Sequence, residues 1–364
     1  ITTLLWVREV LQQHLTGTYA VKDPKGIEIL KPVKIGGVDQ WLHIRGRNRD
    51  NPVLLYLHGG PGHSHIGTMD AVQRSLEEYF TIVQWDQRQT GKSYYSANDE
   101  TAPLTVGQFL TDTEEVIQYL RHHFDQDKLF VMGCSWGSVL GIYMAQRHPD
   151  WLHAYIGVGQ VVNMMENERV LYKRLLSHAQ ELNETKLIAK LETMAPYPNS
   201  EFPEIAFAEN CDFLRTELSR IAGETGMRHL FVENAIKNIN FERLISPHLT
   251  LTDISNSLLG DPVAAFRPPY YFTKELMEID LPADVGCTFE VPIFFFTGTH
   301  DWTTPRLLSD KWFNQITAPY KELIHFKESS HFVLNEEPGK VLMALVNKVL
   351  PSVQEIKSRA VKHA

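Results

Sequence analysis

The sequence lacks the features that mark several large classes of protein. Its 364 residues contain no run of about 18 apolar residues, so we expect no segment that spans a membrane. The formal net charge is −9, which argues against nucleic acid as a partner because phosphate binding needs a basic surface. Only 3 cysteines are present, and their wide spacing at Cys134, Cys211 and Cys287 excludes a disulfide framework. We therefore expect a reducing, cytoplasmic location.

The sequence also lacks internal repeats and low-complexity tracts. Its hydrophobic fraction of 43% excludes a disordered chain and is typical of a globular protein. A single compact core reaches its usual limit near this length. We therefore expect either one large domain that carries an insertion or two domains, whereas nothing in the sequence indicates an oligomeric state.

Short apolar runs alternate with segments of helical periodicity from residue 53 onwards. Such runs, without polar alternation, are typical of strands buried on both faces in a parallel sheet covered by helices. The predicted strands are Val53–Leu57, Phe80–Trp85, Lys128–Met132, Ala154–Val158, Val291–Thr297 and Tyr320–Phe326. Before them, Gly36-Gly37 joins residues 27–35 to 38–45 in a predicted hairpin. The fold class is therefore α/β, with a mainly parallel central sheet.

Two helices are predicted beside these strands. Residues 105–124 place apolar side chains on one stripe, with Thr105 as the N-cap and with Asp112, Glu114 and Glu115 on the solvent side. A second helix, residues 138–148, ends before a proline.

The alternation of strand and helix breaks off between residues 161 and 287. This stretch reads as helices and loops without a clear buried strand, with helices predicted at residues 161–179, 184–192, 206–221, 229–238 and 268–278. We therefore predict a core formed by residues 1–160 and 288–364, with a helical cap inserted at 161–287. The insertion carries 19 Asp/Glu and 12 Lys/Arg, and so −7 of the net charge of −9. An acidic surface of this kind serves solubility or attracts a cationic substrate.

A G-x-S-x-G sequence at residues 133–137 supplies a candidate nucleophile, Ser135. It follows a predicted strand and opens a predicted helix, which is the context that this motif requires. The sharp turn lifts the serine hydroxyl above the carboxyl end of the sheet, where open α/β sheets bind ligands. We expect the neighbouring Cys134 to point away from Ser135, toward the sheet, as a packed thiol.

An acid and a histidine follow downstream in the order that a Ser-Asp-His triad needs. Asp301 and His331 each come shortly after a predicted strand. We predict that His331 removes the proton of Ser135 and that Asp301 fixes the imidazole tautomer. His300 and His325 are weaker competitors for the role of base.

Residues 58–62, His-Gly-Gly-Pro-Gly, follow the first strand of the parallel sheet. Acyl transfer needs two backbone N–H groups directed at the developing oxyanion. We predict that Gly60 supplies one and that Trp136, the residue after the nucleophile, supplies the other.

These motifs resemble the proline iminopeptidase family of α/β-hydrolases. The matching sequences are His58-Gly59-Gly60-Pro61-Gly62, Asp86-Gln87-Arg88 with Gly91-Lys92-Ser93, and Gly133-Cys134-Ser135-Trp136-Gly137-Ser138. The resemblance implies an α/β-hydrolase fold, a helical cap over the site, and release of an N-terminal residue from a peptide.

Two departures from this family stand out. Gln89 and Thr90 occupy the positions where the family's loop has a glycine and its neighbour. The segment between Trp151 and Trp302 contains no tryptophan, although characterised members carry a Trp-Glu pair in the cap. Glu166 and Glu168 are our candidates for holding a substrate amine, and solvated helix charges are the alternative interpretation.

The predicted function is a serine hydrolase that removes an N-terminal proline or another small apolar residue from short peptides or amides. An esterase, lactonase or acyl-transfer enzyme acting on a small metabolite is the alternative, and a protein that only binds ligands is a third. No cofactor is expected. No metal is expected either, because His63-Ser64-His65 and His122-His123 lack accompanying ligands at metal-binding spacing.

Overall fold

The computed structural model describes residues 2–97, 104–199, 204–224, 241–254 and 273–353. Its centre is one eight-stranded sheet in the order β1-β2-β4-β3-β5-β6-β7-β8. The first two strands form an antiparallel hairpin, β2 pairs antiparallel with β4, and all the remaining pairs are parallel. The strands are β1 (Ile27–Ile35), β2 (Val38–Gly46), β3 (Val53–Leu57), β4 (Thr81–Asp86), β5 (Leu129–Cys134), β6 (Leu152–Val158), β7 (Ile293–Gly298) and β8 (Lys321–Phe326).

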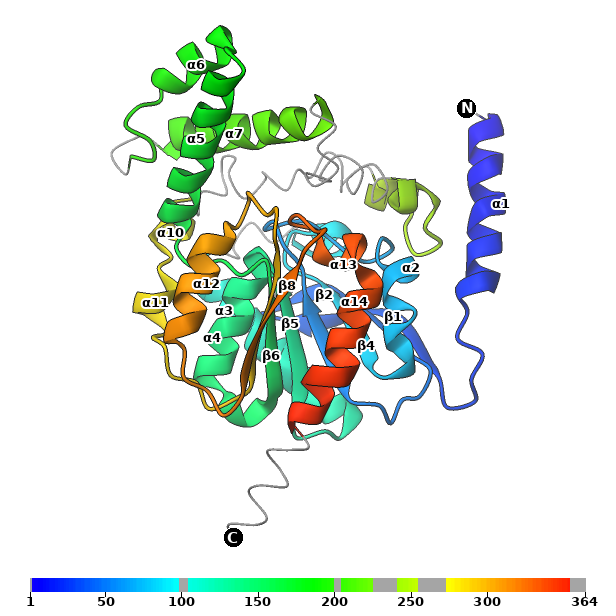
Figure 1. Ribbon diagram of the computed structural model, residues 1–364. Coiled ribbons are helices and arrows are strands. Elements are labelled where there is room, and N and C mark those ends of the chain that lie inside the picture. Colours follow the sequence, from blue (N-terminus) through cyan, green and yellow to red (C-terminus); the bar gives the residue numbers. More distant parts are fainter. Residues whose placement is uncertain (1, 98–103, 200–203, 225–240, 255–272, 354–364) are drawn as a thin grey trace.

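Helices cover both faces of this sheet (Figure 1). One face packs against α3 (Val106–Phe124), α4 (Trp136–Arg147) and α12 (Arg306–Gln315). The other face packs against α13 (Val333–Glu336), α14 (Pro338–Ala344) and the π-helical turn that continues it to Val349. Alternate residues of β5 enter the two cores, because successive side chains of a strand point to opposite faces. The predicted α/β fold with a mainly parallel sheet is therefore confirmed.

The prediction for Asp112 is wrong. Asp112 is fully buried in α3 and accepts two hydrogen bonds of 2.9 Å from the guanidinium of Arg88, together with one of 2.7 Å from Gln40 Nε2. Glu114 is partly exposed and Glu115 is exposed. Asp112 lies on the buried side because it neutralises a buried arginine that arrives from the loop after β4.

Between β6 and β7 the described elements are helices, apart from one isolated bridge between Asn163 and Asp280. They are α5 (Met164–Glu181), α6 (Thr185–Glu192), α7 (Glu204–Glu224), short helical stretches at 241–245 and 251–254, α10 (Thr273–Glu278) and α11 (Leu281–Asp284). Side chains of α5, α6 and α7 form a separate hydrophobic core. These helices project beyond the carboxyl ends of the parallel strands (Figure 1). The helix expected at 229–238 and the start of the one at 268–278 lie outside the described residues.

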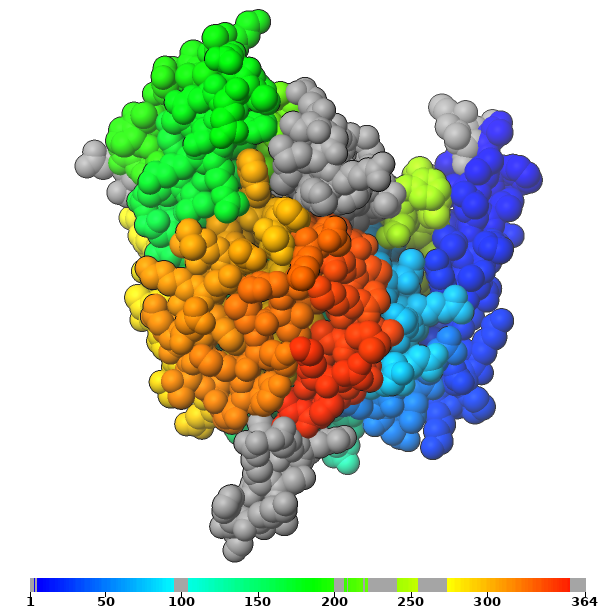
Figure 2. Space-filling model, viewed as in Figure 1, coloured from blue at the N-terminus to red at the C-terminus, as the bar shows by residue number. Residues whose placement is uncertain are grey.

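The N-terminal helix α1 (Thr2–Tyr19) lies beside the segment 241–254 (Figures 1 and 2). Arg8 donates hydrogen bonds to the carbonyls of Leu244 at 2.8 Å and Leu249 at 2.6 Å. Gln12 Nε2 donates to the carbonyl of Ser246 at 2.6 Å. The first helix therefore holds a part of the chain more than 230 residues away. Among the described helices, not one combines the length and apolar character needed to cross a bilayer.

Candidate active site

Ser135 stands on the turn between β5 and α4. Its backbone adopts φ +53° and ψ −119°, a region that costs a residue with a side chain about 1–3 kcal/mol. The N–H of Ser135 donates to the carbonyl of Val158 at 2.9 Å, so the end of β6 holds the strained turn in place. Because this sharp turn lies at the end of a central strand, it places the serine hydroxyl in the space above the sheet.

The glycines of the motif allow the backbone to approach closely around this turn. A Cβ on Gly133 would lie 2.2 Å from the carbonyl oxygen of Gly137, and a Cβ on Gly137 would lie 2.0 Å from that of Leu57. A Cβ on Gly59 would lie 3.1 Å from Cβ of Ser135. Glycine is therefore required at both ends of G-x-S-x-G, because β3, β5 and the start of α4 approach one another too closely there for a side chain.

Asp301 and His331 meet at the carboxyl ends of β7 and β8. Nδ1 of His331 lies 2.8 Å from Oδ2 of Asp301, and both side chains are buried. Asp301 also accepts from the backbone N–H groups of Thr303 and Thr304 at 2.8 Å and from the hydroxyl of Thr304 at 2.7 Å. These donors fix the orientation of the carboxylate toward the imidazole.

The local electrostatics act on the pKa of His331 in opposite directions. Burial alone would lower it, but the negative charge of Asp301 and the hydrogen bond to it outweigh that effect. The pKa of His331 therefore lies above its ordinary value. A more basic imidazole is a stronger proton acceptor, although it must be neutral to act as a base.

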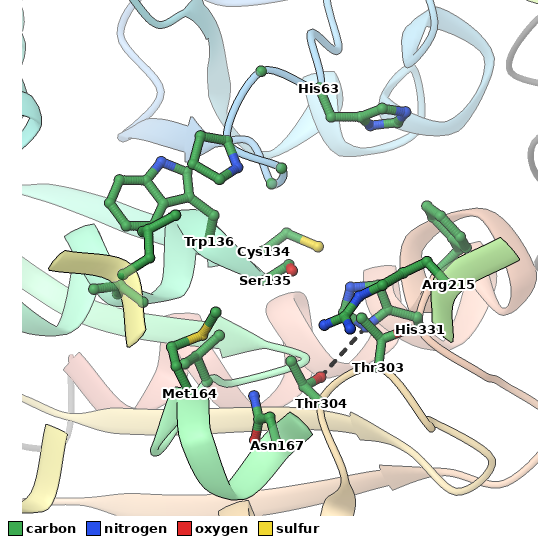
Figure 3. A pocket seen from close by; sticks show the side chains of 18 of the residues that line it. His63, Cys134, Ser135, Trp136, Met164, Asn167, Arg215, Thr303, Thr304 and His331 are labelled. Carbon is green, nitrogen blue, oxygen red and sulfur yellow. Dashed lines mark hydrogen bonds between the residues drawn. The ribbon is translucent and has the colours of Figure 1, made fainter. Parts of the chain in front are cut away.

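Ser135 and His331 line the same cavity of about 490 Å³ (Figure 3). Gly60 and Trp136, the predicted oxyanion donors, line it as well. Gly60 has φ +110°, and a Cβ there would lie 2.6 Å from the backbone nitrogen of Gly62, so this turn requires a glycine. The structure thus brings five sequence-predicted residues, Asp301 included, to one end of the sheet.

Gln87 joins the two predicted oxyanion segments, a role that the sequence did not reveal. Its backbone N–H donates to Nε2 of His58 at 3.1 Å, and its side-chain amide donates to the carbonyl of His58 at 3.0 Å. Nε1 of Trp136 donates to Oε1 of Gln87 at 3.0 Å. Two residues further on, Gln89 has φ +59°. A glycine would adopt that backbone conformation without steric penalty, which is consistent with the glycine found in the related family.

The prediction for Cys134 is confirmed only in part. Its side chain is buried and belongs to a hydrophobic core of the sheet, as predicted, but it also lines the cavity that Ser135 lines (Figure 3). Cys134 shares a face of β5 with Met132, but at the strand end that face opens into the cavity. Burial raises the pKa of the Cys134 thiol to about 12, so it stays protonated and is a poor nucleophile.

The two candidate amine-binding glutamates occupy different environments. Glu168 is buried in α5, lines the cavity, and pairs through both carboxylate oxygens with the guanidinium of Arg215. The hydroxyl of Tyr197 donates to it at 2.7 Å. Glu166 pairs with Arg169, with about half of its side chain exposed, and is not among the described residues that line the cavity. Arg215, which points into the cavity in Figure 3, carried no signal in the sequence.

Comparisons with known proteins identify the family of this chain. The family model described as "alpha/beta hydrolase fold" matches residues 52–338. The chain is 32% identical over 324 residues to the probable aminopeptidase YbaC of Bacillus subtilis, covering 88% of this chain and 95% of that protein. It is 30% identical over 185 residues to the proline iminopeptidase of Elizabethkingia meningoseptica, covering 50% of this chain and 58% of that protein.

The fold itself recurs in solved structures. The proline iminopeptidase of Mycobacterium smegmatis superposes with a TM-score of 0.56 at 18% identity, covering 90% of this chain and 99% of that one. The family model spans most of the chain and the YbaC alignment nearly all of that relative. This chain belongs to the α/β hydrolase fold family.

Proposed function

We propose that this chain is a serine hydrolase that removes an N-terminal proline, or another small apolar residue, from short peptides or amides. The observation that carries the proposal is the hydrogen bond between His331 and Asp301 at the cavity that Ser135 also lines. A strained serine, a buried His-Asp pair and two backbone donors together form the equipment of acyl transfer. The names of the relatives suggest a peptide substrate.

The proposed chemistry has two steps. In the first, His331 removes the proton of Ser135 as its oxygen attacks the scissile carbonyl, and the N–H groups of Gly60 and Trp136 hold the oxyanion. The tetrahedral intermediate then collapses, and His331 returns the proton to the departing amine. In the second step, His331 activates a water molecule that hydrolyses the acyl-enzyme and regenerates Ser135. Asp301 holds the tautomer of His331 throughout.

The size and lining of the cavity support small substrates. A volume of about 490 Å³ suits a ligand of a few residues. The described lining includes apolar side chains on the side of α5 and α10, among them Val161, Met164 and Leu276. Such a surface suits a proline ring or a small aliphatic side chain better than a charged one.

Glu168 is the carboxylate that we propose near the substrate's amino group, because Glu166 lies away from the cavity lining. Both oxygens of Glu168 are engaged by Arg215, so an incoming ammonium would share this carboxylate with a guanidinium. This arrangement favours a second candidate, an esterase or acyl-transfer enzyme with the same triad whose substrate carries no free amine.

A substrate panel separates the two candidates. We expect prolyl and alanyl arylamides to be cleaved, and the same compounds with an acetylated amino group to be poor substrates. Turnover of p-nitrophenyl esters without cleavage of any arylamide would contradict the peptidase proposal and favour the second candidate.

A fluorophosphonate probe tests the nucleophile itself. We expect labelling of the wild-type protein and its loss in Ser135→Ala. Ser309→Ala is the matched control, since Ser309 is a buried serine of α12 that is not among the residues lining the cavity. Labelling that survives in Ser135→Ala would show that another residue is the nucleophile, whereas absence of labelling in the wild type would favour a protein that only binds ligands.

A further inference from the structure

A second cluster of polar side chains lies outside the cavity lined by Ser135. It joins His43 of β2, His248 of the segment after helix 241–245, Glu28 of β1 and Asp70 at the start of α2 (Asp70–Gln73). None of the four is among the described residues that line that cavity. Four separate parts of the chain therefore bring imidazole and carboxylate groups to one place.

His43 is the most unusual member of this cluster. Its side chain is 1% exposed, and neither ring nitrogen makes a hydrogen bond within the described part of the protein. An unpaired polar atom in the interior is unfavourable, and most such atoms in native proteins have a partner. In the described part of the protein both ring nitrogens therefore lack a partner, and an imidazole nitrogen is a common metal ligand.

The neighbours of His43 have the spacing of a ligand set. The ring centroids of His43 and His248 are 4.3 Å apart, and one donor atom from each of Glu28, His43 and His248 falls within 4.8 Å of the others. Nε2 of His248 lies 3.1 Å from Oδ2 of Asp70. Two imidazoles and the carboxylate of Glu28 thus lie close enough to face a common centre, and Asp70 lies beside His248.

The charged groups near this cluster are already partly paired, since Asp70 faces His248. Oε2 of Glu242, on the segment that also carries His248, is buried without a hydrogen-bond partner in the described residues. The adjacent cation, Arg45, is already paired with Glu28 and Glu77. A bound cation would supply the missing partner of His43.

We propose that His43, His248 and Glu28 bind one divalent transition-metal ion, with Asp70 beside the imidazole of His248. Imidazole nitrogens with carboxylate oxygens are the donor set typical of Zn²⁺, whereas Mg²⁺ and Ca²⁺ prefer oxygen alone. Oε1 of Glu28 already pairs with Arg45 and Oε2 accepts from the N–H of Val21 at 3.2 Å. Each oxygen has a second lone pair, which leaves Glu28 able to ligate. Sequence spacing did not reveal this site because its donors lie far apart along the chain.

The ion would fasten the segment 242–248 to the hairpin β1–β2. Arg243, next to Glu242, lines the cavity of Ser135 and donates to the carbonyl of Ser64 at 3.4 Å. The proposed site would therefore support one wall of the cavity from behind. It is independent of the proposed hydrolase chemistry, since no ligand belongs to the triad.

The test is metal binding by the full chain after treatment with a chelator. Titration with Zn²⁺, followed by calorimetry, is expected to show one site and a higher unfolding temperature. Co²⁺ should give the intense visible absorption of a tetrahedral complex, and Mg²⁺ should leave both signals unchanged. His43→Ala and His248→Ala should each weaken binding at least tenfold, and Glu28→Gln, a change at a partly exposed position, should weaken it less.

His148→Ala is the matched control, because His148 also faces a carboxylate, Glu114 at 3.1 Å. It should bind Zn²⁺ like the wild type. Equal binding by the wild type and both histidine variants would mean an adventitious ion only and would overturn the proposal. So would a folded wild-type protein, shown by circular dichroism, that takes up no Zn²⁺. Should His43→Ala fail to fold, unchanged Zn²⁺ affinity in Glu28→Gln and His248→Ala would overturn it as well.

Discussion

Two His-Asp pairs lie near strand β8. Their nitrogen-oxygen distances are similar, but they differ in burial and in their position relative to the cavity. His331 and Asp301 are 2.8 Å apart, buried, and placed where the carboxyl ends of two parallel strands meet a cavity. His325 and Asp310 are 3.0 Å apart, but their side chains are 37% and 26% exposed, and neither is among the described cavity-lining residues. A carboxylate beside an imidazole is therefore not enough to identify a candidate catalytic pair. Placement at the strand ends and exclusion of water distinguish the first pair.

Replacing each histidine by alanine is expected to show the largest difference in activity between the two pairs. His331→Ala should lower kcat by about 10⁴- to 10⁶-fold, because His331 is the group that we propose takes the proton of Ser135. His325→Ala should stay within about threefold of the wild type, as expected of a surface substitution. Steady-state kinetics on the best arylamide measures both. A large loss in His325→Ala with an active His331→Ala would reverse the assignment.

Replacing the aspartate of each pair by asparagine tests the same difference between the two pairs. Asp301→Asn should lower kcat by about 10⁴-fold, because an amide permits the wrong imidazole tautomer. Asp310→Asn should have little effect on kcat. If Asp301→Asn kept wild-type turnover, another carboxylate would have to supply the acid.

Gln87 tests whether a residue that only supports the predicted oxyanion donors also affects the rate. Gln87→Leu removes the hydrogen bonds that link His58 to Trp136, and we expect kcat to fall about 10- to 100-fold with little change in KM. Gln126→Leu is the matched control, since Gln126 braces the opposite end of β3 through the N–H of Val53. It should lower the unfolding temperature without that loss of kcat. If the two variants lowered kcat equally, Gln87 would contribute to stability alone and would not position the oxyanion donors.

The pH dependence should also reflect the buried pair. Because the pKa of His331 lies above its ordinary value, the neutral base is lost as the pH falls through a pKa higher than about 6.5. The acid limb of kcat/KM is expected there, and in Asp301→Asn it should move to lower pH because the raising charge is gone. The pH profiles of both proteins provide the measurement. An acid limb that stays in place in Asp301→Asn would show that it reports another group.

The smallest effect is expected at Cys134. Cys134→Ser is nearly isosteric, and the native thiol stays protonated, so kcat/KM should remain within about threefold. A loss of 100-fold or more would show that the cavity-lining thiol contributes to substrate binding or to the reaction.

Much of the sheet could be predicted because its strands are short, apolar and punctuated by glycine. The runs at 53–57 and 129–134 are buried on both faces, so hydrophobicity alone locates them. Ser135, Asp301 and His331 could be chosen since the carboxyl ends of parallel strands meet at one edge of the sheet.

The remaining features depend on contacts between distant residues, which local patterns do not encode. Asp112 resembles a surface residue until Arg88 is placed beside it. Glu168 resembles a free carboxylate until Arg215 arrives from another helix. The same is true of His43, whose neighbour His248 is more than 200 residues away. In each case the sequence gives the residue type, but only the folded chain supplies the partner.

The contacts of α1 have a practical consequence for work with this protein. Arg8 and Gln12 cap three carbonyls of the segment 241–254, and Lys92 clamps the same segment through Asp253 at 2.8 Å. Deleting the first twenty residues would leave those carbonyls without their donors and loosen the stretch that carries Arg243. Versions of the chain that lack α1 therefore need comparison with the intact one before any kinetic constant is attributed to the active site.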